Sequence, residues 1–211
     1  MDKINVILTV WKRDNLEEQL NAIQKQTANI NELYVYQNES HVGIDHLKAR
    51  YDFKHIQSKN INFKFHGRFT LPLLFNTKYT AIFDDDTIPN KGWLDHCKKL
   101  CDEKNCIVGA NCRNIVGHCW FFKTEWIHHM WREKAPTFDN GEDIHFCAAC
   151  KIHGGIDSYL PTQIQEQPEN WGDTKTSLGA DHHATWRKST HNSMRDRLYR
   201  DWIEKGWSVN S

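Results

Sequence analysis

Residues 81–86 read Ala-Ile-Phe-Asp-Asp-Asp, an apolar stretch that leads directly into three consecutive carboxylates. The apolar part predicts a buried strand, and open α/β sheets bind their ligands at the carboxyl ends of such strands. Three adjacent carboxylates repel one another, so a fold that keeps them needs a compensating cation. Their oxygen atoms suit Mg²⁺ or Mn²⁺, which often link a protein to the phosphates of a nucleotide. We call Asp84, Asp85 and Asp86 the acidic triplet.

The N-terminal residues predict the start of an α/β sheet. Residues 4–10 are aliphatic and β-branched, which is typical of a buried strand. Asp14 is the expected N-cap of a helix, with Glu17 as its capping-box partner and apolar residues following at helical spacing. Residues 32–37 predict a second strand. Strand, helix and strand with short connections form a βαβ unit, which implies a parallel pair.

The rest of the chain continues the alternation of strands and helices. Further strands are expected at 62–65, 79–83, 107–110 and 118–122, and helices at 71–75, 91–103, 124–132, 142–152 and 192–205. The polar stretch 154–180 contains prolines and glycines and is expected to be a long loop that serves as a binding lid. The prediction is one α/β domain over residues 1–211, with a mixed, mostly parallel sheet flanked by helices.

Composition narrows the class of protein. Lys plus Arg and Asp plus Glu each number 27, so no net field attracts nucleic acid or an anionic membrane. No apolar run approaches the roughly 20 residues of a membrane span, and no charged leader with a cleavage site is evident. We therefore expect a soluble, cytoplasmic protein with no nucleic-acid partner.

The seven cysteines are expected to be reduced and largely buried. Cys147 and Cys150 have the spacing of metal ligands. They also continue an apolar helical pattern and lack a matching second pair. Core packing is therefore favoured over a structural zinc site.

The acidic triplet has three interpretations. In the first, Asp86 ligates a divalent ion, while Asp84 and Asp85 contact a ribose or support the metal. In the second, the triplet is a solvated acidic turn that needs no ion. In the third, Asp84 is the nucleophile of a haloacid-dehalogenase-type phosphatase, although that motif usually follows the first strand of its fold and this strand is the fourth. A non-catalytic carbohydrate-binding module is a further alternative, because aromatic faces pack against sugars and Trp171 lies in the predicted lid.

Several motifs, taken in order, resemble those of the GT-A glycosyltransferases, and within them the exostosin-like group. Residues 65–69, Phe-His-Gly-Arg-Phe, precede the strand and the acidic triplet in a similar arrangement. Residues 141–144, Gly-Glu-Asp-Ile, resemble the Glu-Asp motif that opens the catalytic helix. His183, Arg187 and Asn192 fall at spacings similar to the terminal motifs of these enzymes. The resemblance spans most of the chain and extends to the N-terminal glycosyltransferase domain of a chlorovirus protein.

The resemblance implies a UDP-sugar donor, a glycan or glycoprotein acceptor, Mn²⁺ or Mg²⁺ as cofactor, and retention of configuration. It implies a nucleotide-binding half over about 1–90 and an acceptor and catalytic half over about 91–211. The residues implied for the nucleotide sugar are Thr9, Arg13, Asn38, Arg68, Asp84 and Asp85. Those implied for the metal are Asp86 and His183, with His182 as a substitute for the latter. Those implied for catalysis are Asp143, Glu142 and Arg187.

The chemistry of this set is consistent with transfer from a nucleotide sugar. Charge builds on the departing diphosphate, so a divalent ion with Arg and His donors lowers the barrier. Arginine binds phosphate through two parallel hydrogen bonds. Each residue also has a plainer explanation, since most arginines are surface residues. Glu142 and Asp143 could simply favour the first turn of a helix, where backbone N–H groups are exposed.

Overall fold

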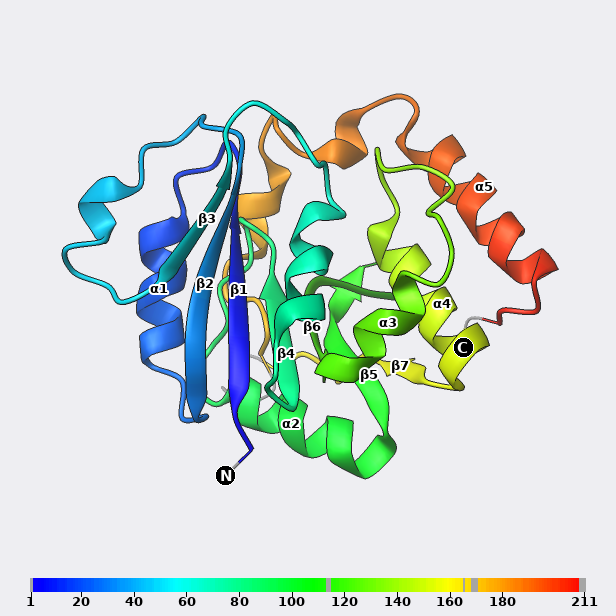
Figure 1. The fold of residues 1–211 in the computed structure, drawn as a ribbon, viewed down its shortest axis with the longest axis horizontal. Coiled ribbons are helices and arrows are strands. Elements are labelled where there is room, and N and C mark those ends of the chain that lie inside the picture. Colours follow the sequence, from blue (N-terminus) through cyan, green and yellow to red (C-terminus); the bar gives the residue numbers. More distant parts are fainter. Residues whose placement is uncertain (1, 113–114, 165, 168–170, 209–211) are drawn as a thin grey trace.

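A computed structural model describes residues 2–112, 115–164, 166–167 and 171–208, and a seven-stranded sheet runs through them (Figure 1). The strands are β1 Ile4–Val10, β2 Ile30–Asn38, β3 Lys54–Ser58, β4 Tyr79–Phe83, β5 Cys106–Cys112, β6 Ile115–Lys123 and β7 Asp157–Tyr159. Their order in the sheet is β3-β2-β1-β4-β6-β5-β7. Among the described pairings only β6 is antiparallel to its neighbours. The predicted mixed, mostly parallel α/β sheet is confirmed.

Five α-helices and several 3₁₀ helices lie in the described ranges. The α-helices are α1 Leu16–Gln24, α2 Trp93–Lys104, α3 Ile127–Met130, α4 Glu142–Gly154 and α5 His191–Glu204. The 3₁₀ helices include η1 Asp45–Leu47, η2 Gly67–Leu74, η3 Thr124–Trp126, η5 Thr176–Ala180 and η6 Thr185–Arg187. None of the helices in these ranges combines the length and the hydropathy needed to cross a bilayer.

Helices α2 and α4 cover opposite faces of the sheet. Successive residues of a strand point to opposite faces, so the contacts of two neighbouring residues on β6 identify the helix on each side. On one face, Phe121 of β6 packs against Tyr79, whose hydroxyl donates to Asp102 of α2 at 2.6 Å. On the other face, Phe122 packs against Phe146 of α4, with ring centroids 4.9 Å apart. Strand β1 lies between β2 and β4, and all seven of its residues are buried. Coverage of both faces explains why that strand is almost wholly apolar.

Among the cysteines whose side chains the structure describes there is no disulfide, and these six are buried and free: Cys97, Cys101, Cys106, Cys119, Cys147 and Cys150. Cys147 and Cys150 lie within α4, and the Sγ atom of Cys150 donates to the carbonyl of Trp126 at 3.6 Å. Burial raises the pKa of both thiols, which disfavours the thiolate that a zinc ion requires. Core packing, rather than a structural zinc site, explains this pair.

The structure corrects four of the predicted elements. Asn15 rather than Asp14 is the N-cap of α1, and no side chain caps that helix. The third strand lies at Lys54–Ser58 instead of 62–65, and β7 lies inside the predicted loop 154–180. The helix predicted at 124–132 is η3 followed by the short α3. The other strands and the helices α2, α4 and α5 lie within a few residues of their predicted positions.

Candidate active site

A cavity of about 700 Å³ opens at the carboxyl-terminal edge of β1, β2 and β4. These three strands are parallel, so their ends meet at one edge of the sheet. Strand β6 runs the other way, and therefore brings residues from its first half to the same edge. The volume is that of a typical small-molecule site. Ten of the residues predicted from sequence line it: Thr9, Arg13, Asn38, Arg68, Asp84, Asp85, Asp86, Glu142, Asp143 and His183.

Helix α1 holds the backbone of the acidic triplet in place. The side-chain amide of Gln19, which is fully buried, donates to the carbonyl oxygens of Asp84 at 2.5 Å and Thr87 at 3.0 Å. The amide of Asn15 donates to the carbonyl of Asp85 at 3.0 Å. This use of Asn15 explains why its side chain does not cap the helix that it precedes.

Two arginines partly balance the charge of the acidic triplet. Arg68 Nη1 lies 2.5 Å from Asp84 Oδ1. Arg13 Nη1 lies 2.6 Å from Asp85 Oδ1 and 3.2 Å from Asp86 Oδ2. Burial raises the pKa of Asp85 to about 6 and that of Asp84 well above its usual range. The protein therefore keeps Asp84 and Asp85 in a place where their ionised forms are costly.

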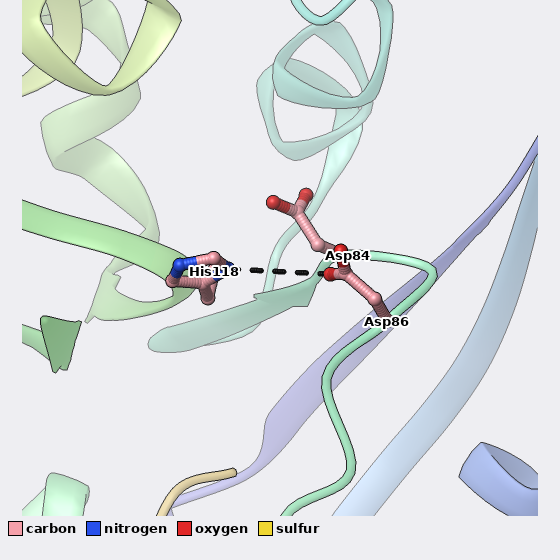
Figure 2. Close-up of side chains that lie close together, drawn as sticks. All are labelled: Asp84, Asp86 and His118. Carbon is pink, nitrogen blue, oxygen red and sulfur yellow. Dashed lines mark ion pairs between the residues drawn. The ribbon is translucent and has the colours of Figure 1, made fainter. Parts of the chain in front are cut away.

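Asp84, Asp86 and His118 could together hold a metal ion, because one ligand atom from each lies within 4.8 Å of the others. Figure 2 shows the carboxylate of Asp86 pointing toward the ring of His118, and their nearest atoms are 4.0 Å apart. Asp86 Oδ1 is buried and makes no hydrogen bond to a described residue. Carboxylate oxygens with one imidazole suit Mn²⁺. The residues present therefore fit the predicted ion.

His118 was not predicted as a site residue. It lies on β6, and its carbonyl accepts hydrogen bonds from Asp84 N at 2.8 Å and Thr87 Oγ1 at 3.1 Å. Its backbone φ is +60°, an uncommon value for a residue with a side chain. The antiparallel register of β4 and β6 brings it beside the triplet, and that register is a tertiary property with no local signal in the sequence.

His183 and Arg187 are placed differently from each other. His183 lines the cavity, where its ring lies edge-on to Trp11, but it is not part of the group that could hold a metal. Arg187 is exposed and outside the lining, and its guanidinium donates to the carbonyl of Ala180 at 2.6 Å. Their predicted roles toward the metal and the diphosphate stay predictions.

Arg13 also binds the segment that precedes His183. Its guanidinium donates to both carboxylate oxygens of Asp181, from Nε and from Nη2, at 2.9 Å each. The hydrogen bonds from Arg13 hold the pKa of Asp181 below its usual value. Gly179 lies close enough to the triplet that a Cβ atom there would be 2.9 Å from Asp86 Oδ2. The segment 179–183 therefore forms one wall of the cavity.

Glu142 and Asp143 begin α4 and have separate arginine partners. Arg68 Nη2 donates to Glu142 Oε1 at 2.8 Å, and burial raises the pKa of Glu142 to about 7. Arg195 of α5 donates to both oxygens of Asp143, at 3.0 and 2.8 Å. Asp143 and Arg195 are 4% and 5% exposed. Helix α5 is therefore part of the site.

Arg195 is a second residue that the sequence interpretation missed. It shares a helical stripe with Leu198 and Trp202, at i, i+3 and i+7, and all three are buried. An arginine in the apolar stripe of a helix requires a buried anionic partner. That signal was available in the sequence, although it does not identify Asp143 as the partner.

Thr9 and Asn38 line the cavity as predicted, whereas the tryptophan that lines it is not the predicted one. Thr9 donates to the carbonyl of Phe83 at 2.8 Å. Asn38 Nδ2 donates to Asn62 Oδ1 at 2.8 Å. Trp171 is outside the cavity lining, whereas Trp186, which is 52% exposed, lies within it.

The fold matches solved structures, although no family model and no curated protein matches the sequence. The mannosyltransferase PcManGT from Pyrobaculum calidifontis, in complex with GDP-Man and Mn²⁺, is 18% identical, with a TM-score of 0.60 over 75% of this chain and 54% of that one. TarS of S. aureus is 13% identical, with a TM-score of 0.61 over 99% and 44%. Its fragment 1–349 has the same identity and TM-score, over 96% and 71%. The chain spans about half the length of the first two, and this likeness shows that it shares their fold.

Proposed function

We propose that this chain is a metal-dependent glycosyltransferase that moves a sugar from a nucleoside-diphosphate sugar, expected to be a UDP-sugar, to a hydroxyl of a glycan acceptor. The observation that carries the proposal is the acidic triplet at the carboxyl ends of parallel strands, with Asp84, Asp86 and His118 grouped around a space that fits an ion. Fold likeness to a mannosyltransferase bound to GDP-Man and Mn²⁺ adds support.

The donor side of the site is rich in groups that complement a diphosphate. Mn²⁺ or Mg²⁺, held by Asp86 with Asp84 and His118, would stabilise the negative charge that develops on the leaving diphosphate. Arg13 also lines the cavity, and its planar guanidinium matches the geometry of a phosphate group. Thr9 and Asn38, at the ends of β1 and β2, are assigned to the nucleoside. His183, predicted as a metal ligand, lies outside the group that could hold the ion, so we assign it to the diphosphate.

The sugar side is formed by the start of α4. Asp143 is held in one orientation by Arg195, which suits a carboxylate that stabilises positive charge at the anomeric carbon. Glu142, with a pKa of about 7, can exchange a proton with an acceptor hydroxyl near neutral pH. Retention of configuration is proposed from the exostosin-like motifs. That subgroup and the relation to a chlorovirus protein rest on the motifs alone.

The first experiment is titration calorimetry with UDP and with GDP, each with and without Mn²⁺. We expect uptake of one nucleotide to depend on the metal. A panel of UDP-sugars with GDP-mannose, screened for metal-dependent hydrolysis, then identifies the donor sugar. Absence of metal-dependent binding of either nucleotide would sink the proposal.

Two further assays separate the alternatives. A phosphatase would hydrolyse a simple phosphate ester with Mg²⁺ and would lose that activity in Asp84→Ala, without responding to nucleotides. A non-catalytic carbohydrate-binding module would bind glycans even after all three aspartates are replaced by asparagine. No observation in the described residues favours either alternative over transfer.

A further inference from the structure

A second cavity, of about 240 Å³, lies beside the first and shares Asn62 and Lys64 with it. Its walls come from two segments that are distant in sequence, 62–70 and 131–138. Lys64 Nζ lies 3.4 Å from Asp139 Oδ1, so an ion pair connects the two segments where the cavities meet. The second cavity therefore adjoins the proposed donor site, and apart from Asn62 and Lys64 it is lined by different residues.

Aromatic side chains line the second cavity. Phe63 and Phe138 are 49% and 40% exposed, although large apolar side chains are normally buried. Trp131 also lines it, and its indole nitrogen donates to the carbonyl of Phe69 at 3.0 Å, which fixes the ring. Three aromatic rings around one small hollow present apolar surface to a ligand that also carries polar groups.

The buried His66 gives the cavity a polar group. It lines the cavity and is 2% exposed, the backbone of Phe138 lies near the ring, and neither ring nitrogen makes a well-aligned hydrogen bond to a described residue. Its ring lies edge-on to Phe138, with centroids 4.9 Å apart. Burial lowers the pKa of His66 to about 3, so the ring is neutral and offers one donor and one acceptor nitrogen. Buried polar atoms without partners are rare and call for a ligand or water.

We propose that the second cavity binds one sugar unit of the glycan acceptor, an inference that rests on the proposed transferase function. A pyranose ring has apolar C–H faces for Phe63 and Phe138 and hydroxyl groups that can pair with a nitrogen of His66. The position is suitable, because Phe138 is only four residues before Glu142 in the chain. A sugar held there places the next unit of the glycan in the main cavity, beside α4.

The nucleobase of the donor is the rival occupant, because Asn62 also contacts Asn38, which is assigned to the nucleoside. The two occupants differ in what a substitution does. If the cavity holds an acceptor sugar, changing Phe138 leaves nucleotide affinity intact. If it holds the base, nucleotide affinity falls with it.

The test uses the whole chain with Mn²⁺ and the nucleotide that calorimetry selects. Binding of methyl glycosides of glucose, galactose, mannose, N-acetylglucosamine and rhamnose is measured by saturation-transfer NMR and titration. We expect at least one glycoside to bind, and Phe138→Ala to weaken it about tenfold or more while nucleotide affinity stays within twofold. Leu74→Ala, at a residue that is 82% exposed and outside both cavities, is the matched control and should change neither.

A second variant guards against misfolding. His66→Phe keeps a buried ring and removes both nitrogens, and a thermal melt reports whether the fold survives. We expect the glycoside to bind at least fivefold more weakly to this variant. The inference is overturned if no glycoside binds a chain that binds nucleotide, or if Phe138→Ala weakens nucleotide and glycoside equally. Failure of nucleotide binding itself would instead overturn the proposed function.

Discussion

Two groups of carboxylates face the same cavity, and the fold balances them differently. The acidic triplet has two arginines for three carboxylates, and Arg13 and Arg68 are each shared with a further acid outside the triplet. Asp86 keeps one buried oxygen without a hydrogen bond. Asp143, in contrast, has both oxygens bound by Arg195. The first group leaves room for the cation that the proposed function assigns to it, whereas Asp143 of the second is paired within the fold.

The largest effect on activity should come from a substitution in the acidic triplet. Asp86→Asn keeps the shape of the side chain and removes its charge, so we expect metal-dependent transfer to fall by about 10³-fold or more in kcat/KM. The matched control is Asp52→Asn, the same change at an exposed residue outside the cavity. Retention of Mn²⁺-dependent nucleotide binding in Asp86→Asn would contradict the assignment of the ion to the triplet.

Breaking the pair of Asp143 and Arg195 should mainly lower the stability of the fold. Arg195→Gln leaves the buried Asp143 without its ionic partner, and we expect the free energy of unfolding to fall by about 3–5 kcal/mol in urea denaturation. The double variant Arg195→Gln with Asp143→Asn should recover part of that loss, because no buried charge is left unpaired. A double variant that is as unstable as the sum of the single variants would mean that the two side chains are not coupled.

Glu142 shares Arg68 with Asp84 of the triplet and is next to Asp143 in the chain. Its titration should make the free energy of unfolding depend on pH. Its pKa of about 7 in the folded chain lies above the ordinary value of 4.5, so the folded state holds its proton more tightly than the unfolded state. The protonated form of Glu142 therefore contributes ~3 kcal/mol to the free energy of unfolding below pH 4.5, and this contribution is lost as the pH rises toward 7. Urea denaturation of metal-free protein at several pH values measures it.

The control for that dependence is Glu204→Gln, at an exposed residue that ends α5. Glu142→Gln should flatten the decline in unfolding free energy between pH 4.5 and 7, whereas Glu204→Gln should leave it unchanged. An unchanged decline in Glu142→Gln would assign it to Asp84 and Asp85, whose pKa values are also raised by burial.

The smallest effect is expected at Asp181, whose side chain is 31% exposed. Asp181→Asn weakens the hold of Arg13 on the segment 179–183, and partly exposed ion pairs contribute at most about 1 kcal/mol. Thermal denaturation should therefore shift by only a few degrees. A loss as large as that of Arg195→Gln would show that this pair is as essential to the fold as the pair at α4.

The features that the sequence predicted well are those with a local signal. Strand β4 is a continuous apolar run, and its acidic end could be placed at the ligand edge because β1 and β2 were also recognisable. Strand β3, Lys54–Ser58, has a polar sequence because it lies at the edge of the sheet, and it was missed. Alternating residues at 62–65 were assigned instead, and they line the two cavities.

The parts of the site that were missed depend on long-range pairing. His118 reaches the triplet through the direction of β6, and Arg195 reaches Asp143 through the packing of α5 on α4. In both cases the partner lies 32 or more residues away, so no local pattern identifies it; only Arg195, in the apolar stripe of its helix, indicated that a partner was needed. The role of Arg187 was assigned by spacing to motifs, and its exposed position reflects a local turn that spacing does not describe.

The contacts made by α1 have a consequence for ion affinity. Gln19 and Asn15 fix three carbonyl groups of the loop after β4 through hydrogen bonds that involve no ion. A preorganised loop loses little conformational freedom on binding, and less of the binding energy is spent on ordering it. Manganese affinity should therefore depend on a glutamine that never touches the ion, and the first helix acts as a remote determinant of how tightly the metal is held.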